Sequence, residues 1–335
     1  MKMAAVVAVL PLVVSTLAVL LCAPAVAAGA APLSVDFHAV SCPQLESIVR
    51  SSVQAALQRE IALAAGLLRI FFHDCFPQGC DASVYLNGTN SELQQGPNLS
   101  LQPRALKLVD DIRAKVHAAC GPIVSCADIS ALATRDVVVV SGGPSFAVSL
   151  GQLDSLTPAS AALVGQLPSP FTASVQTLLA SFKTRGLGEA GDLVALSGGH
   201  TIGRSQCDFI RPAEDTYSRK MAANCTKNPK RLENLDAITP DAFDNGYYIA
   251  LTFNQGVFTS DMALIRDRTT APIVKQFAND KAAFFAQFAK SMVKLSKVPR
   301  PSGNVGEIRR ISCFRTNASP LLAVDSSDEG LAASA

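Results

Sequence analysis

Cysteine number and position restrict the fold of this chain more than any other feature of its sequence. Nine cysteines occur in 335 residues, and one of them, Cys22, falls inside an apolar leader. The other eight form an even set, which in an exported chain predicts four disulfides. They are Cys42, Cys75, Cys80, Cys120, Cys126, Cys207, Cys225 and Cys313. Eight cysteines permit many pairings, and the sequence by itself does not choose among them.

The leader predicts export. Lys2 precedes a long run of Ala, Val and Leu that ends in small residues at 25–27, the pattern of a secretory signal peptide over residues 1–27. A membrane anchor is the alternative, but Pro11 and Pro24 interrupt the run and no stop-transfer charge cluster follows. Glycosylation sequons agree with export, and they begin at Asn87, Asn224 and Asn317.

The charge balance argues against a nucleic-acid partner. The formal net charge is +2, and removal of the leader deletes only Lys2, which leaves +1. No basic block or stripe occurs, and no later segment is apolar enough to span a bilayer. The remaining chain of about 300 residues can form a large core or two halves around a cleft, so function must be sought in a site.

Helical periodicity dominates the mature chain. Apolar residues recur every three or four positions after Pro43, at 45, 48, 49, 53, 56 and 57, and again at 106, 109, 112 and 116. Alternation typical of strands is scarce, so a mostly α protein is expected. Further helices are expected at residues 126–138, 174–183, 192–197, 244–254 and 271–294. The small, polar tail at 316–335 is expected to be disordered.

Two of the four histidines have neighbours that suggest chemistry. Arg69 and His73 are four residues apart, so on a helix a fixed cation and a titratable imidazole share one face. His200 follows a short apolar helix and stands beside two glycines, which would let a flat, bulky ligand approach the backbone. His200 is therefore a candidate axial metal ligand. His38 and His117 lack such neighbours and are interpreted as ordinary structural residues.

Zinc is the alternative metal, because His73, Asp74 and Cys75 are adjacent. Zinc is less well supported, since export favours oxidation of Cys75 and Cys80 to a disulfide and no two histidines lie at ligand spacing.

The segments around both histidines resemble a known family. Residues 67–86 are similar to the distal signature of class III plant secretory haem peroxidases, and residues 192–207 are similar to their proximal haem-ligand signature. The similarity extends from about Phe37 to Cys313. It implies an all-α haem peroxidase fold, with two helical halves sandwiching a haem, four disulfides and two calcium sites. The implied domain spans residues 28–315, with a distal half at about 33–165 and a proximal half at about 166–315.

The resemblance also implies roles at the haem, which would be one haem b. His73 would be the general acid and base that moves a proton between the oxygens of peroxide, with Asn98 accepting a hydrogen bond from its other ring nitrogen. Arg69 would stabilise the developing negative charge. His200 would bind the iron, and Asp261 would accept the second ring proton of that histidine.

Two Ca²⁺ ions are implied by the same resemblance, each with a mixed set of oxygen ligands. The distal set comprises Asp74, Asp81 and Ser83 with the carbonyls of Pro77 and Gly79, supported through water by Glu92. The proximal set comprises Thr201, Asp236, Thr239 and Asp244 with the carbonyl of Ala242. The family's disulfides correspond to Cys42–Cys120, Cys75–Cys80, Cys126–Cys313 and Cys207–Cys225.

The chain departs from the family pattern at several positions. Pro77 replaces a more usual Val but retains the carbonyl that calcium would need. Gln152 and Leu153 replace a pair of arginines, which could leave the buried carboxylate of Asp128 short of a partner. Phe146 replaces a Trp. The stretch between Cys207 and Cys225 is shorter than usual, and this makes its disulfide the least secure of the four.

The implied enzyme is a peroxidase, a donor:hydrogen-peroxide oxidoreductase that reduces hydrogen peroxide to water while oxidising small phenolic donors by one-electron steps. Donors would meet the haem edge near Pro168, Ser169 and Phe209. The resemblance implies roles in peroxide removal, the oxidative stress response and cell-wall phenolic and lignin metabolism. It also implies a monomer that is secreted to the wall or sent to the vacuole. Two alternatives are a haem- or calcium-stabilised wall-binding protein with little turnover and a zinc hydrolase.

Overall fold

The computed structural model describes residues 32–319, and these form a predominantly helical protein. The signal peptide predicted at 1–27 and residues 320–335 of the predicted tail lie outside the described residues. The prediction of disorder is wrong for residues 316–319, because the N–H of Asn317 donates to the Glu307 carboxylate and its Nδ2 donates to the Ile308 carbonyl. The α-helices are α1 (Leu45–Arg59), α2 (Leu63–Gln78), α3 (Pro103–Cys120), α4 (Cys126–Val140), α5 (Ala161–Val164), α6 (Val175–Lys183), α7 (Ala190–Ser197), α8 (Thr216–Lys227), α9 (Gly246–Thr252), α10 (Thr259–Arg266), α11 (Ala271–Asn279) and α12 (Lys281–Leu295). Within 32–319 no helix is both long and apolar enough to cross a membrane.

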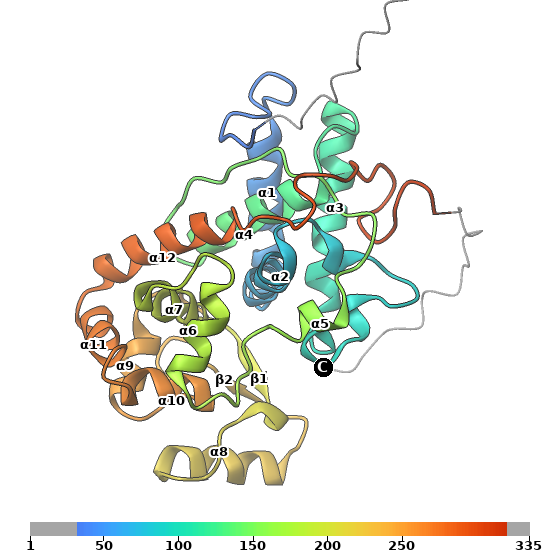
Figure 1. Ribbon diagram of the computed structural model, residues 1–335. Coiled ribbons are helices and arrows are strands. Elements are labelled where there is room, and N and C mark those ends of the chain that lie inside the picture. Colours follow the sequence, from blue (N-terminus) through green and yellow to red (C-terminus); the bar gives the residue numbers. More distant parts are fainter. Residues whose placement is uncertain (1–31, 320–335) are drawn as a thin grey trace, which may run out of the picture. The chain divides into compact units, whose positions relative to one another are not determined.

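The first four long helices form one packed group (Figure 1). α1 packs on α3 and α4, and α2 packs on the same two helices. The apolar stripe predicted for α1 is buried, with Val49 and Val53 fully inaccessible. α4 is buried on almost all sides, and its buried residues include the charged Asp128, Arg135 and Asp136. The predictions of helices around 45–57, 106–116 and 126–138 are confirmed.

A second group contains α7 and α9–α12 (Figure 1). α12 packs on α7, while α11 packs on α9, α10 and α12. The single helix predicted at 271–294 is wrong, because the chain is extended at Asp280 and begins a new helix there. The Asp280 carboxylate accepts a hydrogen bond from the main-chain N–H of Ala283, which caps α12. α12 also contacts α2, so the two groups share one core.

Little β-structure occurs in the described residues. Strand β1 (Arg204–Gln206) pairs antiparallel with β2 (Leu232–Asn234), with Ser205 opposite Glu233. The segment between these strands carries α8 and the Cys207–Cys225 disulfide. The pairing of β1 with β2 therefore brings together the two ends of the segment 207–231, shortly after His200 in the chain.

The structure contains the four disulfides expected from the fold class, with the pairs Cys42–Cys120, Cys75–Cys80, Cys126–Cys313 and Cys207–Cys225. The third joins residues 187 apart. By the chain-entropy account such a loop contributes at most about 5 kcal/mol.

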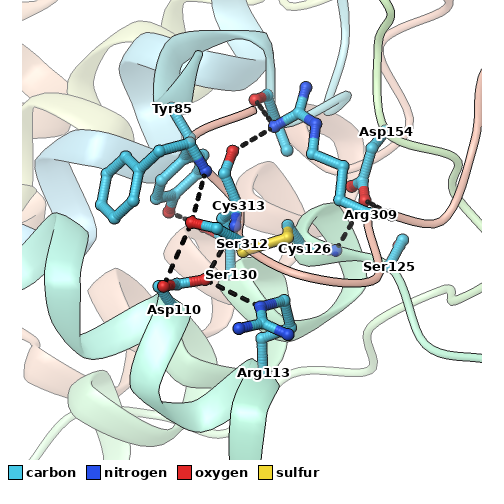
Figure 2. The surroundings of a disulfide bond; sticks show 12 residues. Tyr85, Asp110, Arg113, Ser125, Cys126, Ser130, Asp154, Arg309, Ser312 and Cys313 are labelled. Carbon is cyan, nitrogen blue, oxygen red and sulfur yellow. Dashed lines mark hydrogen bonds and ion pairs between the residues drawn. A yellow bond between two sulfur atoms is a disulfide. The ribbon is translucent and has the colours of Figure 1, made fainter. Parts of the chain in front are cut away.

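Polar contacts reinforce the Cys126–Cys313 disulfide (Figure 2). Asp110 accepts a hydrogen bond from the N–H of Cys313 at 2.7 Å and pairs with Arg113 at 2.7 Å. Arg309 is fully buried. Its guanidinium donates to the Cys313 carbonyl, and its main-chain N–H donates to the Asp154 carboxylate. These contacts fix residues 309–313 against α3 and α4.

The buried carboxylate of Asp128 does have a partner. Nε2 of His38 lies 3.1 Å from its Oδ2, and both residues are almost inaccessible. The main-chain N–H groups of Gly151 and Gln152 also donate to it. The imidazole of His38 thus supplies the contact that the missing arginine leaves open, which agrees with its interpretation as a structural residue.

Candidate active site

His73 lies on α2, and its ring is oriented by a residue outside that helix. Its Nδ1 is 2.7 Å from Oδ1 of Asn98, which is 2% exposed. Asn98 is itself fixed, because its Nδ2 donates to the main-chain carbonyl of Glu92 at 3.0 Å. Since the Asn98 amide oxygen can only accept, Nδ1 of His73 carries the proton and Nε2 keeps its lone pair.

Arg69 lies one turn before His73 and places a cation beside that free nitrogen. Its Nε is 3.4 Å from Nε2 of His73. The other guanidinium nitrogens donate to the carbonyls of Ser100 at 2.9 Å and Pro97 at 3.0 Å. The helical spacing predicted a shared face, and the structure shows that the two side chains do lie together.

The electrostatics of this pair favour a neutral imidazole. Burial lowers the pKa of His73 to about 3, the charge of Arg69 adds to the effect, and the hydrogen bond with Asn98 opposes it. Burial also lowers the pKa of Arg69, but a guanidinium stays protonated in proteins. At neutral pH His73 can therefore accept a proton, while Arg69 can stabilise negative charge.

His200 lies in a short 3-10 helix, Gly198–Thr201, directly after α7. Its Nδ1 is 2.8 Å from Oδ1 of Asp261 on α10, whose side chain is 1% exposed. The side chain of His200 is 34% exposed, so its other nitrogen is not enclosed by protein. A histidine that donates one ring N–H to a buried carboxylate has the arrangement typical of a metal ligand.

The two glycines before His200 differ in what they accommodate. A Cβ at Gly198 would collide with the hydroxyl of Tyr248 and the ring of Phe284, so this glycine is needed for packing within the second helix group. A Cβ at Gly199 would lie 3.3 Å from the side chain of Leu68 on α2. At both glycines, side chains of the protein itself therefore lie close to the backbone.

Oxygen-bearing side chains gather directly after His73. Asp74, Asp81, Ser83 and Glu92 are all at most 1% exposed. Among the described residues Oγ of Ser83 and Oε2 of Glu92 have no hydrogen-bond partner. Burial raises the pKa of Asp74 well above its usual value, and the charges of Asp81 and Glu92 raise it further. Such a cluster of buried acids and unpaired oxygens suits a hard cation.

A second oxygen cluster follows His200. The hydroxyl of Thr201 lies 3.1 Å from Oδ2 of Asp236, and the hydroxyl of Thr239 lies 2.9 Å from Oδ1 of Asp244. Asp236 and Thr201 are fully buried. Burial raises the pKa of Asp236, with the charge of Asp244 adding to the effect. A Cβ at Gly246 would strike three of these side chains.

Within residues 32–319 no three His, Cys, Asp or Glu side chains are grouped as metal ligands. Each oxygen cluster instead combines acids with hydroxyl groups, and in the first cluster the remaining ligands would be the carbonyls of Pro77 and Gly79. For the second cluster the remaining ligand would be the carbonyl of Ala242.

An exposed aromatic pair lies at the predicted donor entrance. The rings of Phe171 and Phe209 have centroids 6.2 Å apart, and Phe171 is 54% exposed. The loop that carries Phe171 is fixed by a hydrogen bond from the N–H of Ser260 to the Pro170 carbonyl. Ser169 Oγ accepts from the N–H of Phe171 at 3.3 Å, so the conformation after Pro168 is defined.

A helical fold with an oriented histidine in each of two helix groups is what the resemblance to haem peroxidases implied, and comparison with known proteins places the chain in that class. A family model described as Peroxidase matches residues 49–280. Cationic peroxidase SPC4 of Sorghum bicolor is 47% identical, over 85% of this chain and 82% of the relative. Peroxidase 66 of Zea mays is 43% identical over 91% of this chain and 96% of the relative. Peroxidase 12 of Arabidopsis thaliana is 43% identical over 87% of this chain and 85% of the relative.

The chain belongs to the peroxidase family, and within it to the class III plant peroxidases. The family's cofactor is haem, and the residues present fit that group. The side chain of His200 is 34% exposed with only its Nδ1 paired, and Nε2 of His73 is paired only with the long contact to Arg69. Sequence reasoning missed Tyr247, whose hydroxyl also contacts Asp261, because no local pattern marks such a contact.

Proposed function

We propose that Arg69 and His73 handle peroxide in this peroxidase, and that His200, supported by Asp261, would hold the haem iron. The observation that carries the proposal is that each histidine has one ring nitrogen engaged by a buried acceptor, while the other has no acceptor, the Nε2 of His73 receiving only the long contact from Arg69. When bound, haem iron supplies the centre that takes up peroxide and exchanges electrons with donors.

His73 moves the proton. Its Nε2 accepts the proton of one peroxide oxygen and returns it to the other oxygen, which leaves as water. Arg69 stabilises the negative charge that develops on the departing oxygen, a preorganised effect of a few kcal/mol, about 3 by comparison with similar donors. Asn98 keeps the ring in the tautomer that this transfer needs.

Two calcium ions hold the histidine segments in place. The distal ion is bound by the cluster of Asp74, Asp81 and Ser83 with two carbonyls, and Glu92 supports it. The proximal ion is bound by Thr201, Asp236, Thr239 and Asp244 with the Ala242 carbonyl. The unpaired oxygens of Ser83 and Glu92 and the raised pKa of Asp74 support the distal assignment. The raised pKa of Asp236 and its packing against Thr201 support the proximal one.

The donors are small phenols that bind near Pro168, Ser169 and Phe209, oxidised by single electrons. The tilted ring pair of Phe171, which is exposed, and Phe209, which is half-buried, supports flat apolar substrates. Peroxide removal, stress response and wall phenolic metabolism are typical of the family. The protein acts as a secreted monomer at the cell wall, with residues 28–315 as its catalytic domain, divided into halves near residue 165.

A spectroscopic titration tests the proposal. The visible spectrum of the calcium-replete protein is recorded before and after one equivalent of hydrogen peroxide, and again after guaiacol. A Soret band that shifts with peroxide and returns with guaiacol is expected. A band indifferent to peroxide would favour the wall-binding alternative, and stoichiometric zinc without a haem band would favour the hydrolase.

A further inference from the structure

The carboxylate of Asp261 accepts hydrogen bonds from three donors, and two of these share one oxygen. Oδ1 lies 2.8 Å from Nδ1 of His200 and 2.9 Å from the hydroxyl of Tyr247. Oδ2 accepts from the N–H of Phe258 at 2.8 Å. Asp261 is 1% exposed, so these donors replace solvent around the charge.

Tyr247 can only be a donor in this contact. Its side chain is fully inaccessible, and its ring stands edge-on to that of His200 at 85°, with centroids 5.8 Å apart. Burial raises the pKa of Tyr247 well above its usual 10, and the charge of Asp261 raises it further. The phenol therefore keeps its proton and directs it at the oxygen that His200 uses.

Two donors on one carboxylate oxygen compete for the same negative charge. A hydrogen bond to an ionised acceptor is about twice as strong as a neutral one. A second donor to the same oxygen therefore weakens the hydrogen bond that this oxygen accepts from the first donor. The strength of the hydrogen bond from His200 to Asp261 governs how much negative charge the imidazole carries. An axial ligand with more negative charge favours the more oxidised iron.

We infer that Tyr247 is a positioning residue that limits how strongly Asp261 polarises His200 and so raises the reduction potential of the iron. This inference rests on the proposed role of His200 as the iron ligand. Tyr247 touches neither peroxide nor donor in this account, and it acts only through Asp261.

The next residue in the chain provides a matched control. Tyr248 is equally buried, and its hydroxyl donates to the carbonyl of Val194 at 2.9 Å instead of a carboxylate. Tyr247→Phe and Tyr248→Phe each remove one buried hydroxyl from adjacent positions of α9. Only the first should alter the charge on Asp261.

The test compares the haem-loaded wild type with both variants by spectroelectrochemistry and by resonance Raman of the ferrous iron–imidazole stretch. For Tyr247→Phe we expect a more negative potential and a higher stretching frequency. The change in the reduction equilibrium should approach tenfold, which is about 59 mV for one electron. Tyr248→Phe should match the wild type in both quantities.

A second variant tests the opposite direction without removing the hydroxyl. A fluorinated tyrosine at position 247 is a stronger donor of nearly the same shape, so it should raise the potential and lower the stretching frequency. This variant retains the buried hydrogen bond and keeps the inference testable if Tyr247→Phe fails to fold.

The failures of the two ideas are distinguishable. A wild-type iron–imidazole band that stays unmoved in Tyr247→Phe or in the fluorinated variant would overturn the inference and leave the role of His200 intact. A potential that rises in Tyr247→Phe would also overturn it, because loss of the second donor would then not have strengthened the hydrogen bond from His200. Absence of an iron–imidazole band from the wild type would instead refute the proposed ligand, and the inference with it.

Discussion

Replacement of His38 by leucine should destabilise the protein through a carboxylate 90 residues away. The imidazole and Asp128 form a buried pair at 3.1 Å, with exposed fractions of 5% and 1%. Leucine fills similar volume but offers no donor, so one of the three groups that donate to Asp128 is lost.

The remaining contacts set the size of the effect. Breaking a buried pair by removing one partner costs about 3–5 kcal/mol, and a hydrogen bond to a charged group contributes about 1.5–3 kcal/mol. Asp128 keeps the N–H groups of Gly151 at 2.8 Å and Gln152 at 3.1 Å, which solvate part of its charge. We therefore expect a loss of about 2–3 kcal/mol in the free energy of unfolding.

The pH dependence of this loss follows from Asp128. Burial raises its pKa above 3.8, and the hydrogen bond from His38 is the first influence that opposes the rise. Loss of His38 should raise that pKa further. A group with a raised folded-state pKa gives stability at low pH that is lost as pH rises toward that pKa. The deficit of the variant should thus be smallest below the folded-state pKa of Asp128, which lies above 3.8, and grow as pH rises above that pKa.

The assay is denaturant unfolding with the disulfides intact, at several pH values, for His38→Leu, Asp128→Asn and the double variant. A coupling energy of at least about 1 kcal/mol between the two sites is expected. His38→Gln, which retains an N–H donor, serves as the control and should recover part of the stability. Additive single effects, or a deficit that shrinks as pH rises, would refute the reasoning.

Further expectations concern the site. His73→Leu should slow the reaction with peroxide by about 10²–10⁴-fold in stopped-flow experiments while haem remains bound, and an unimpaired rate would contradict its role as base. Arg69→Leu should cost about 10²–10³-fold in the same rate, and a change in donor oxidation alone would contradict it. The rate of the wild-type protein with peroxide should stay constant as pH is lowered from neutral and should fall only near pH 3, where protonation of His73 removes its lone pair. A midpoint near 6.5 would instead show that burial does not set the pKa of His73. Chelation should remove two calcium ions and lower the thermal midpoint, since each site contributes about 4 kcal/mol at a thousand times its Kd, and an unchanged midpoint would argue against bound calcium.

The long helices could be predicted from the sequence, because their periodic apolar faces are local information. The division of the stretch 271–294 could not, since Asp280 competes with helix propagation through a side-chain cap that a periodicity count does not weigh. The partners of His38 and Tyr247 were also beyond local reasoning. They lie 90 and 14 residues away in the chain, and only packing brings them together.

The two histidine sites share a plan that links catalysis to stability. Each reactive ring is fixed by a residue from another element, Asn98 for His73 and Asp261 for His200, and each lies next to an oxygen cluster. Glu92 belongs to the first cluster and its carbonyl also accepts from Asn98, so a shift of that acid would turn the amide that orients His73. In the second cluster Thr201 is covalently adjacent to His200. Loss of a cation from either cluster should therefore disturb ring orientation before it unfolds the helices, and peroxide reactivity should decline at lower chelator exposure than helical content does.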